Sequence, residues 1–143
     1  MTRTRRLIIL AIIIAWATRA ADGSPVANEH EERLWRAVCQ VESGGRVNAI
    51  GDGGNAVGIA QIWKVCVDDV NRIIGRTEYT YDDRLSAARS KEMFLIYTRH
   101  YCRAAGGWTA ERAARIWNGG PRGYQKTATA GYWQKVERAM SNG

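Results

Sequence analysis

Apolar residues recur every three or four positions along most of the chain, which is the spacing that one buried face of an α-helix requires. Alternation of apolar and polar residues, the pattern of a half-buried strand, is weak throughout. The pattern predicts helices over residues of about 29–43, 63–74, 86–104, 109–116 and 129–140. We therefore expect a mainly α, single-domain fold with irregular glycine-rich loops at 44–58 and 118–127.

Residues at the helix ends support these boundaries. Asn28 is a typical N-cap, and Glu31 three positions later can complete a capping box. Gly75 suits the end of the second helix and Thr109 the start of the fourth, which the Asn-Gly-Gly-Pro run at 118–121 should end. The residues expected to face inward are Leu34, Trp35, Ala37, Val38, Val41, Ala88, Phe94, Leu95 and Tyr101.

The first twenty residues follow a different pattern. Three arginines precede an unbroken apolar run at 7–17, which is shorter than the 20 or so residues that span a bilayer. Small residues follow, so 1–20 reads as a secretory signal peptide, cleaved after Ala20 or alternatively after Ala17. An uncleaved N-terminal anchor is the other interpretation. We expect a flexible lead-in at 21–28, a folded domain at 29–143, and a secreted or periplasmic protein.

The positive charge is smaller than it first looks. The chain has 21 Lys and Arg against 14 Asp and Glu, a net charge of +7. Four of these arginines lie in 1–20, so the net charge of the mature chain is +7 − 4 = +3. A nucleic-acid-binding surface requires a basic stripe with interleaved aromatic residues. The arginines are instead scattered over every predicted helix, so we expect no nucleic-acid partner. We also expect the protein to be a monomer.

The chain has three cysteines, Cys39, Cys66 and Cys102. In an oxidising compartment two of them could pair in any of three ways, or all three could be buried thiols. There is no CxxC motif, and both histidines lie far from any cysteine in sequence. We therefore expect neither a metal site nor a cofactor.

Glu42 is the best candidate for acid–base chemistry. It ends the first predicted helix beside its apolar face and precedes a glycine-rich loop. A carboxyl group that is partly wrapped by apolar side chains has a raised pKa and can act as a general acid, which a glycosidase needs to protonate the leaving oxygen. The alternative is a solvated acid at a helix end.

Other candidates follow in the glycine-rich loop. Asp52 could be a second carboxylate, or an ordinary turn former. Gln61, three residues after Gly58, could hold sugar hydroxyl or N-acetyl groups, or bond to loop backbone. The aromatic residues near these motifs that could stack on a sugar face are Trp63, Tyr124 and Tyr132.

Taken together, the motifs resemble a known family. They are Glu42-Ser43, the Ala-Val-Gly-Ile-Ala-Gln-Ile run at 56–62, Trp117-Asn118-Gly119-Gly120, and Tyr132-Trp133. In order and spacing they are similar to the lysozyme-like superfamily, specifically the branch of soluble lytic transglycosylases and goose-type lysozymes. The resemblance covers residues of about 34–136. It differs at Trp117, where the family usually has Tyr, and in a Glu42-to-Gln61 spacing one residue longer than the common transglycosylase pattern.

The resemblance implies a role for each matching residue. Glu42 would be the catalytic acid, and Tyr132 would orient it. The turn from Gly58 to Gln61 would form a substrate-contacting wall of the cleft, with Asn118 facing Glu42. Asp52 would position a water molecule, as proposed for goose-type lysozymes.

The implied reaction is cleavage of the β-1,4 bond between N-acetylmuramic acid and N-acetylglucosamine in peptidoglycan glycan strands. A lysozyme uses water as the nucleophile, and a lytic transglycosylase uses the sugar's own 6-hydroxyl, giving a 1,6-anhydro product. The resemblance does not decide between these two reactions. It also leaves open whether the substrate is peptidoglycan or chitin. A non-catalytic peptidoglycan-binding or inhibitor module on the same fold is the alternative from another functional class.

Overall fold

The computed structural model describes residues 24–143; the predicted signal peptide and the start of the lead-in lie outside this part of the chain. The described residues form five α-helices and a small antiparallel hairpin. The helices are α2 (Glu29–Ser43), α3 (Lys64–Ile74), α4 (Ala87–Ala104), α5 (Ala110–Gly119) and α6 (Ala130–Ser141). The hairpin strands are β1 (Ile50–Gly51) and β2 (Ala56–Val57), joined by the short turn η1 (Asp52–Gly54). Further single turns are η2 (Tyr81–Leu85), η3 (Gly123–Gln125) and η4 (Thr127–Thr129).

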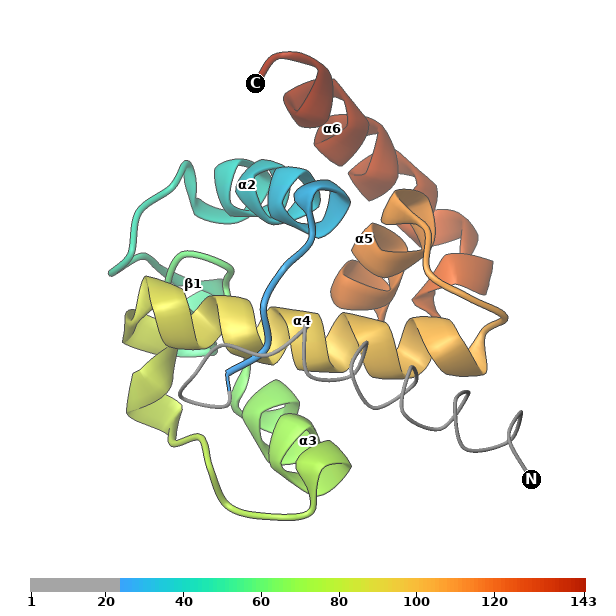
Figure 1. The fold of residues 1–143 in the computed structure, drawn as a ribbon. Helices are drawn as coiled ribbons and strands as arrows, with labels where there is room; N and C mark the ends of the chain where they lie inside the picture. Colours follow the sequence, from blue (N-terminus) through green and yellow to red (C-terminus); the bar gives the residue numbers. More distant parts are fainter. Residues whose placement is uncertain (1–23) are drawn as a thin grey trace, which may run out of the picture.

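Helix α4 runs through the middle of the fold (Figure 1). Helices α2, α5 and α6 pack together on one side of it, and α3 packs on the other. Phe94 of α4 is fully buried at the centre, with its ring 5.4 Å from that of Trp35 and 5.0 Å from that of Trp117. Aromatic rings from α2, α4 and α5 therefore form the centre of the core. The expected mainly α single domain is confirmed.

Most helix boundaries agree with the prediction. Helix α2 has the predicted range, and Asn28 and Glu31 form the expected capping box through two hydrogen bonds of 2.9 Å. Gly75 ends α3 in the left-handed conformation, and the Thr109 side chain caps α5. These ends depend on interactions between residues that are close in sequence, which is why the sequence indicates them.

Two expectations are wrong. Helix α5 does not end at residue 116 but continues to Gly119, because Gly120, with φ 85°, is the residue that leaves the helix. Ala88 is exposed, not buried. It lies two positions before the buried Ser90, and a rotation of about 100° per residue puts it on the opposite side of α4.

The hairpin was not predicted as strands. Ile50 pairs with Val57 and Gly51 with Ala56, and Val57 forms a further bridge to Ile62. Strands of two residues have no measurable alternation, so the pattern of apolar residues cannot indicate them. The hairpin folds the glycine-rich loop back against the end of α2.

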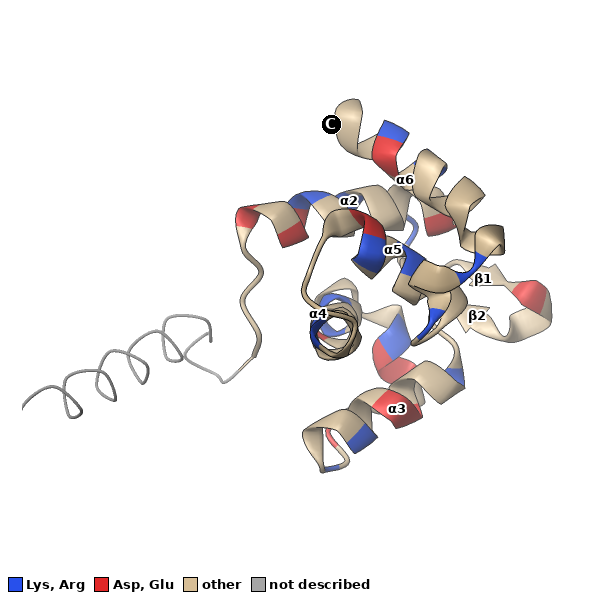
Figure 2. Cartoon of the chain, turned by 90° about the vertical axis from the view of Figure 1, so that its right-hand side faces the viewer, with Lys and Arg blue, Asp and Glu red and all other residues tan. Residues whose placement is uncertain are grey.

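All three cysteines are free thiols, Cys39 and Cys102 buried and Cys66 half-buried, so none of the possible disulfides is present. Within residues 24–143, no helix has both the length and the apolar character needed to cross a membrane. Figure 2 shows cationic and anionic positions mixed over the helices in that view, without a continuous basic stripe.

Candidate active site

A cavity of about 470 Å³ lies where the hairpin meets α2, α3, α4 and α5. Four of the six predicted site residues line it: Glu42, Asp52, Gln61 and Asn118. The other lining residues are Ala56, Ile62, Trp63, Val65, Cys66, Tyr97 and Trp117. The fold therefore brings candidate site residues that are distant in sequence to the same cavity: Glu42 and Asn118 are 76 residues apart (118 − 42 = 76).

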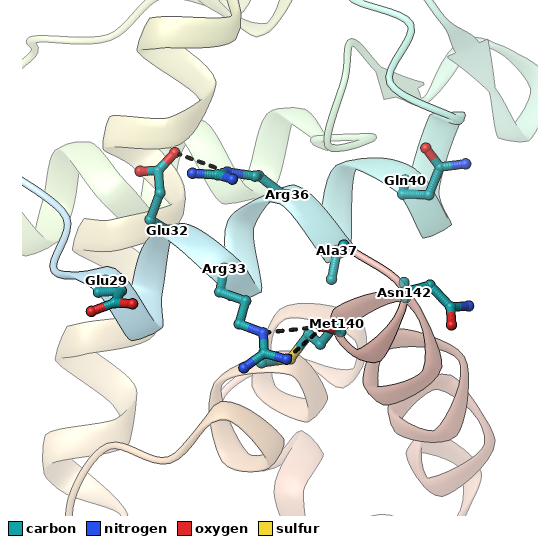
Figure 3. A pocket seen from close by; sticks show the side chains of 10 residues that line it. Glu29, Glu32, Arg33, Arg36, Ala37, Gln40, Met140 and Asn142 are labelled. Carbon is teal, nitrogen blue, oxygen red and sulfur yellow. Dashed lines mark hydrogen bonds and ion pairs between the residues drawn. The ribbon is translucent and has the colours of Figure 1, made fainter.

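A larger cavity of about 940 Å³ lies elsewhere, between α2 and the end of α6 (Figure 3). None of the predicted site residues lines it. Its cations already have partners: Arg33 donates two hydrogen bonds to the carbonyl oxygen of Met140, at 2.8 and 3.1 Å, and Arg36 pairs with Glu32 at 3.7 Å. We therefore place the candidate active site at the smaller cavity.

Glu42 lies in the last turn of α2, where two influences act on its carboxyl group. Burial raises the pKa of Glu42, because desolvation disfavours the charged form. The hydroxyl of Tyr132 in α6 donates a 2.8 Å hydrogen bond to Oε1 of Glu42, which lowers this pKa and offsets part of the rise. The net pKa is raised, so the group keeps its proton to a higher pH than an ordinary Glu, as a general acid must.

Ser43 fixes the end of α2 next to Glu42. Its buried hydroxyl donates to the carbonyl oxygen of Ile59 at 2.7 Å and accepts from the backbone N–H of Arg46 at 3.1 Å. The first bond joins the helix end to the segment just before Gln61. The Glu-Ser pair therefore has a physical basis, because the second residue positions the first relative to the hairpin.

Gln61 and Asp52 line the cavity from strained backbone. They are the two non-glycine residues between 24 and 143 with positive φ, 51° and 48°. Such backbone is uncommon outside glycine and collects at functional sites. The amide nitrogen of Gln61 donates to the carbonyl oxygens of Gly58 and Ala49, at 3.0 and 3.2 Å, so this part of the side chain holds the hairpin together.

Gly58 lies behind the cavity wall and is not among the lining residues. Its φ is 84°, and a Cβ atom there would lie 1.7 Å from the carbonyl oxygen of Arg84. Only glycine allows this close approach between the hairpin and η2. The structure thus gives Gly58 a packing role, which the resemblance did not indicate.

Aromatic side chains form much of the remaining wall. Trp117 packs edge-on against Tyr97, with ring centroids 5.7 Å apart, and Trp63 is 45% exposed at the rim. Tyr97 was missed by the sequence reasoning, because its position in the α4 repeat is that of any core residue. Tyr124 is not a lining residue; its ring lies 5.7 Å from the Arg112 guanidinium.

The cavity holds no cluster of metal ligands. Across the part of the chain that the structure describes, no three His, Cys, Asp or Glu side chains are grouped to bind a metal ion. The chemistry that this arrangement supports is proton transfer by a partly buried carboxyl group in a cavity lined by amide and aromatic side chains.

Comparison with known proteins supports this interpretation. The family described as "Transglycosylase SLT domain" matches residues 21–138. Lysozyme 1 of Crassostrea virginica is 30% identical over 113 residues, which cover 78% of this chain. Invertebrate-type lysozyme 2 of Caenorhabditis elegans is 32% identical over 74 residues, or 52% of this chain. The chain spans only 60% and 43% of the length of these two relatives.

Solved structures share the fold. A chain in the crystal structure of Aeromonas hydrophila PliI in complex with Meretrix lusoria lysozyme superimposes with a TM-score of 0.64 at 30% identity. The match covers 75% of this chain and 88% of that one. The crystal structure of inhibitor-bound lysozyme from Meretrix lusoria matches with the same values.

Proposed function

The chain belongs to the transglycosylase SLT domain family, and from that premise we propose that it cleaves the β-1,4 bond between N-acetylmuramic acid and N-acetylglucosamine in peptidoglycan. The observation that carries the proposal is the carboxyl group of Glu42, which has a raised pKa and lies in a cavity lined by hydrogen-bonding and aromatic side chains. The matched lysozymes support the same class of reaction.

Glu42 acts first as an acid. In its protonated form it gives its proton to the glycosidic oxygen as the bond to the sugar breaks. The carboxylate that results is stabilised by the hydrogen bond from Tyr132. It then accepts a proton from the nucleophile, which restores the starting state.

The nucleophile is either water or the 6-hydroxyl of the same sugar. Asp52 lies on the hairpin side of the cavity and would position water in the first case. A route assisted by the N-acetyl group of the substrate fits this site, because it needs no side chain as covalent nucleophile. Asn118 offers its amide group to the sugar, and Gln61 offers only its amide oxygen, because its amide nitrogen is bonded to the hairpin backbone. Trp63, Tyr97 and Trp117 offer apolar faces. The proposed site of action is outside the cytoplasm, and the active form is a monomer.

The test is Glu42→Gln on purified peptidoglycan. We expect turbidity clearing to fall by at least about 100-fold, the usual contribution of a general acid. Glu137→Gln is the matched control, since Glu137 is exposed on α6 and undergoes the same chemical change. Mass spectrometry of the products separates the two outcomes, since a reducing end indicates a lysozyme and a 1,6-anhydro end a transglycosylase. A Glu42→Gln protein that keeps most of its activity would contradict the assignment, and wild-type protein that binds peptidoglycan but releases no fragments would support the non-catalytic alternative.

A further inference from the structure

Arg84 is a buried cation without an acidic partner. Its side chain belongs to η2, and the residue is 7% exposed. Among residues 24–143, no carboxylate lies within ion-pair distance of it, although other arginines such as Arg89 and Arg99 have such partners. Buried charges normally have an ionic partner or a full set of hydrogen bonds, so the bonds of Arg84 require an explanation.

The guanidinium group of Arg84 is bonded to backbone carbonyl groups. Nε donates to the carbonyl oxygen of Tyr81 at 2.7 Å, which fixes the side chain within its own turn. Nη1 lies 3.2 Å from the carbonyl oxygen of Ile62 and 3.4 Å from that of Asn55. Asn55 directly follows η1, and Ile62 directly follows Gln61, so one nitrogen contacts both ends of the segment that includes β2.

The main chain of Arg84 joins the same segment to α4. Its carbonyl oxygen accepts a 3.2 Å hydrogen bond from the hydroxyl of Ser90, which is fully buried on α4. The same oxygen occupies the space that a side chain at Gly58 would need. Arg84 therefore links the hairpin to the central helix through both its side chain and its backbone.

The hairpin needs such a link. Its two strands have only two residues each, and isolated hairpins are marginally stable even when they are longer. Asp52 and Gln61 also adopt strained backbone that the surroundings must hold in place. A planar guanidinium group, with several donors in a fixed arrangement, can bond to several carbonyl oxygens in a way that a lysine amine cannot reproduce.

We propose that Arg84 is a positioning residue for the cleavage reaction, because its hydrogen bonds to the backbone around β2 hold Asp52 in its working position in the cavity that Glu42 also lines. This inference rests on the proposed function. Arg84 acts through Asp52 and does not itself contact the substrate.

The test is Arg84→Lys, which keeps the charge and removes the planar group of donors. Arg99→Lys is the matched control, since Arg99 is bonded to Glu31 and to the carbonyl oxygen of Val26, away from the cavity. Both variants should unfold at somewhat lower temperatures. On soluble peptidoglycan fragments, we expect Arg84→Lys to lose about 10- to 100-fold in kcat, as small misplacements of reacting groups do. Its KM should change much less than its kcat, since Tyr97, Trp117 and Asn118 lie outside the segment that Arg84 holds. Arg99→Lys should keep its activity within about twofold.

A double-variant cycle with Asp52→Asn distinguishes positioning from general destabilisation. If Arg84 acts through Asp52, the loss in Arg84→Lys/Asp52→Asn will be smaller than the product of the two single losses. Losses that multiply, or equal losses in Arg84→Lys and Arg99→Lys, would overturn the inference. If Arg84→Lys does not fold, Ser90→Ala removes the anchor of the Arg84 carbonyl and is measured in the same cycle. Glu42→Gln tests the proposed function separately, because its result does not depend on the hairpin.

Discussion

Removal of one hydroxyl group, in Tyr132→Phe, tests how the protein sets the proton affinity of Glu42. This hydroxyl donates the 2.8 Å hydrogen bond to the Glu42 carboxyl group. The bond lowers the pKa of Glu42, whereas burial raises it. Without the bond, only the effect of burial remains, so the pKa of Glu42 should rise further.

The size of the rise follows from the strength of the bond. A hydrogen bond to a charged group contributes about 1.5–3 kcal/mol. One pKa unit corresponds to about 1.4 kcal/mol, so the pKa of Glu42 should rise by about one unit and by no more than about two. Because the acid must be protonated to act, the alkaline limb of the pH profile of kcat/KM should move to higher pH by the same amount. The maximal rate should fall, since the acid is weaker and less well oriented.

The assay is the pH profile of cleavage of soluble peptidoglycan fragments. Tyr124→Phe is the control, because the Tyr124 hydroxyl accepts a bond from Gln125 and this residue does not line the cavity. Its profile should coincide with that of the wild type. An alkaline limb that stays in place in Tyr132→Phe, or moves to lower pH, would refute the explanation of the Glu42 pKa.

Three further outcomes are expected. Ser43→Ala should lower the free energy of unfolding by about 1–3 kcal/mol, because it leaves the carbonyl oxygen of the half-buried Ile59 unpaired. Ser141→Ala, at an exposed side chain-to-backbone bond, should change it by less than about 0.5 kcal/mol; urea titrations measure both. Because the folded state binds the Glu42 proton more tightly than the unfolded state, its contribution to stability is full below the ordinary carboxyl pKa of 4.5 and is lost as the pH rises through the raised value. Calorimetry should therefore show a higher Tm for Glu42→Gln than for the wild type at pH 7, with the difference disappearing near pH 4. A thiol reagent should titrate three cysteines in denaturant and react slowly with the native protein, because burial raises their pKa values, to about 12 for Cys39 and Cys66 and about 11 for Cys102.

The helices could be predicted from the sequence because the signals that begin and end them are local. Asn28 and Glu31 are three residues apart and form both bonds of their capping box. Ala88 shows the limit of this approach. An alanine fits either face of a helix, and only the neighbours of α4 determine which face is covered.

The site was predictable in part, and chiefly through the resemblance to a family. Tyr132 and Glu42 are 90 residues apart, and no spacing rule would pair them. No sequence pattern indicates the bonds of Arg84 to the hairpin segment, because its partners are backbone carbonyl oxygens, which every residue has. A residue that acts on the backbone of distant segments becomes visible only when the fold is known.

The arrangement around Glu42 separates proton affinity from geometry. Tyr132 acts on the proton affinity of the carboxyl group by a direct bond. Ser43 and Arg84 instead bond to backbone in the segment that follows the hairpin, and neither bonds to that group. Changes at Tyr132 should therefore move the pH profile, and changes at Ser43 or Arg84 should lower kcat while the pH profile keeps its position. This division follows from the short range of hydrogen bonds, since only a group in contact with the carboxylate strongly stabilises its charged form. Variants at these three positions therefore test whether the pKa of Glu42 is set by its direct neighbour alone. If any loosening of the fold altered this pKa, changes at Ser43 or Arg84 would move the pH profile as well as lower kcat.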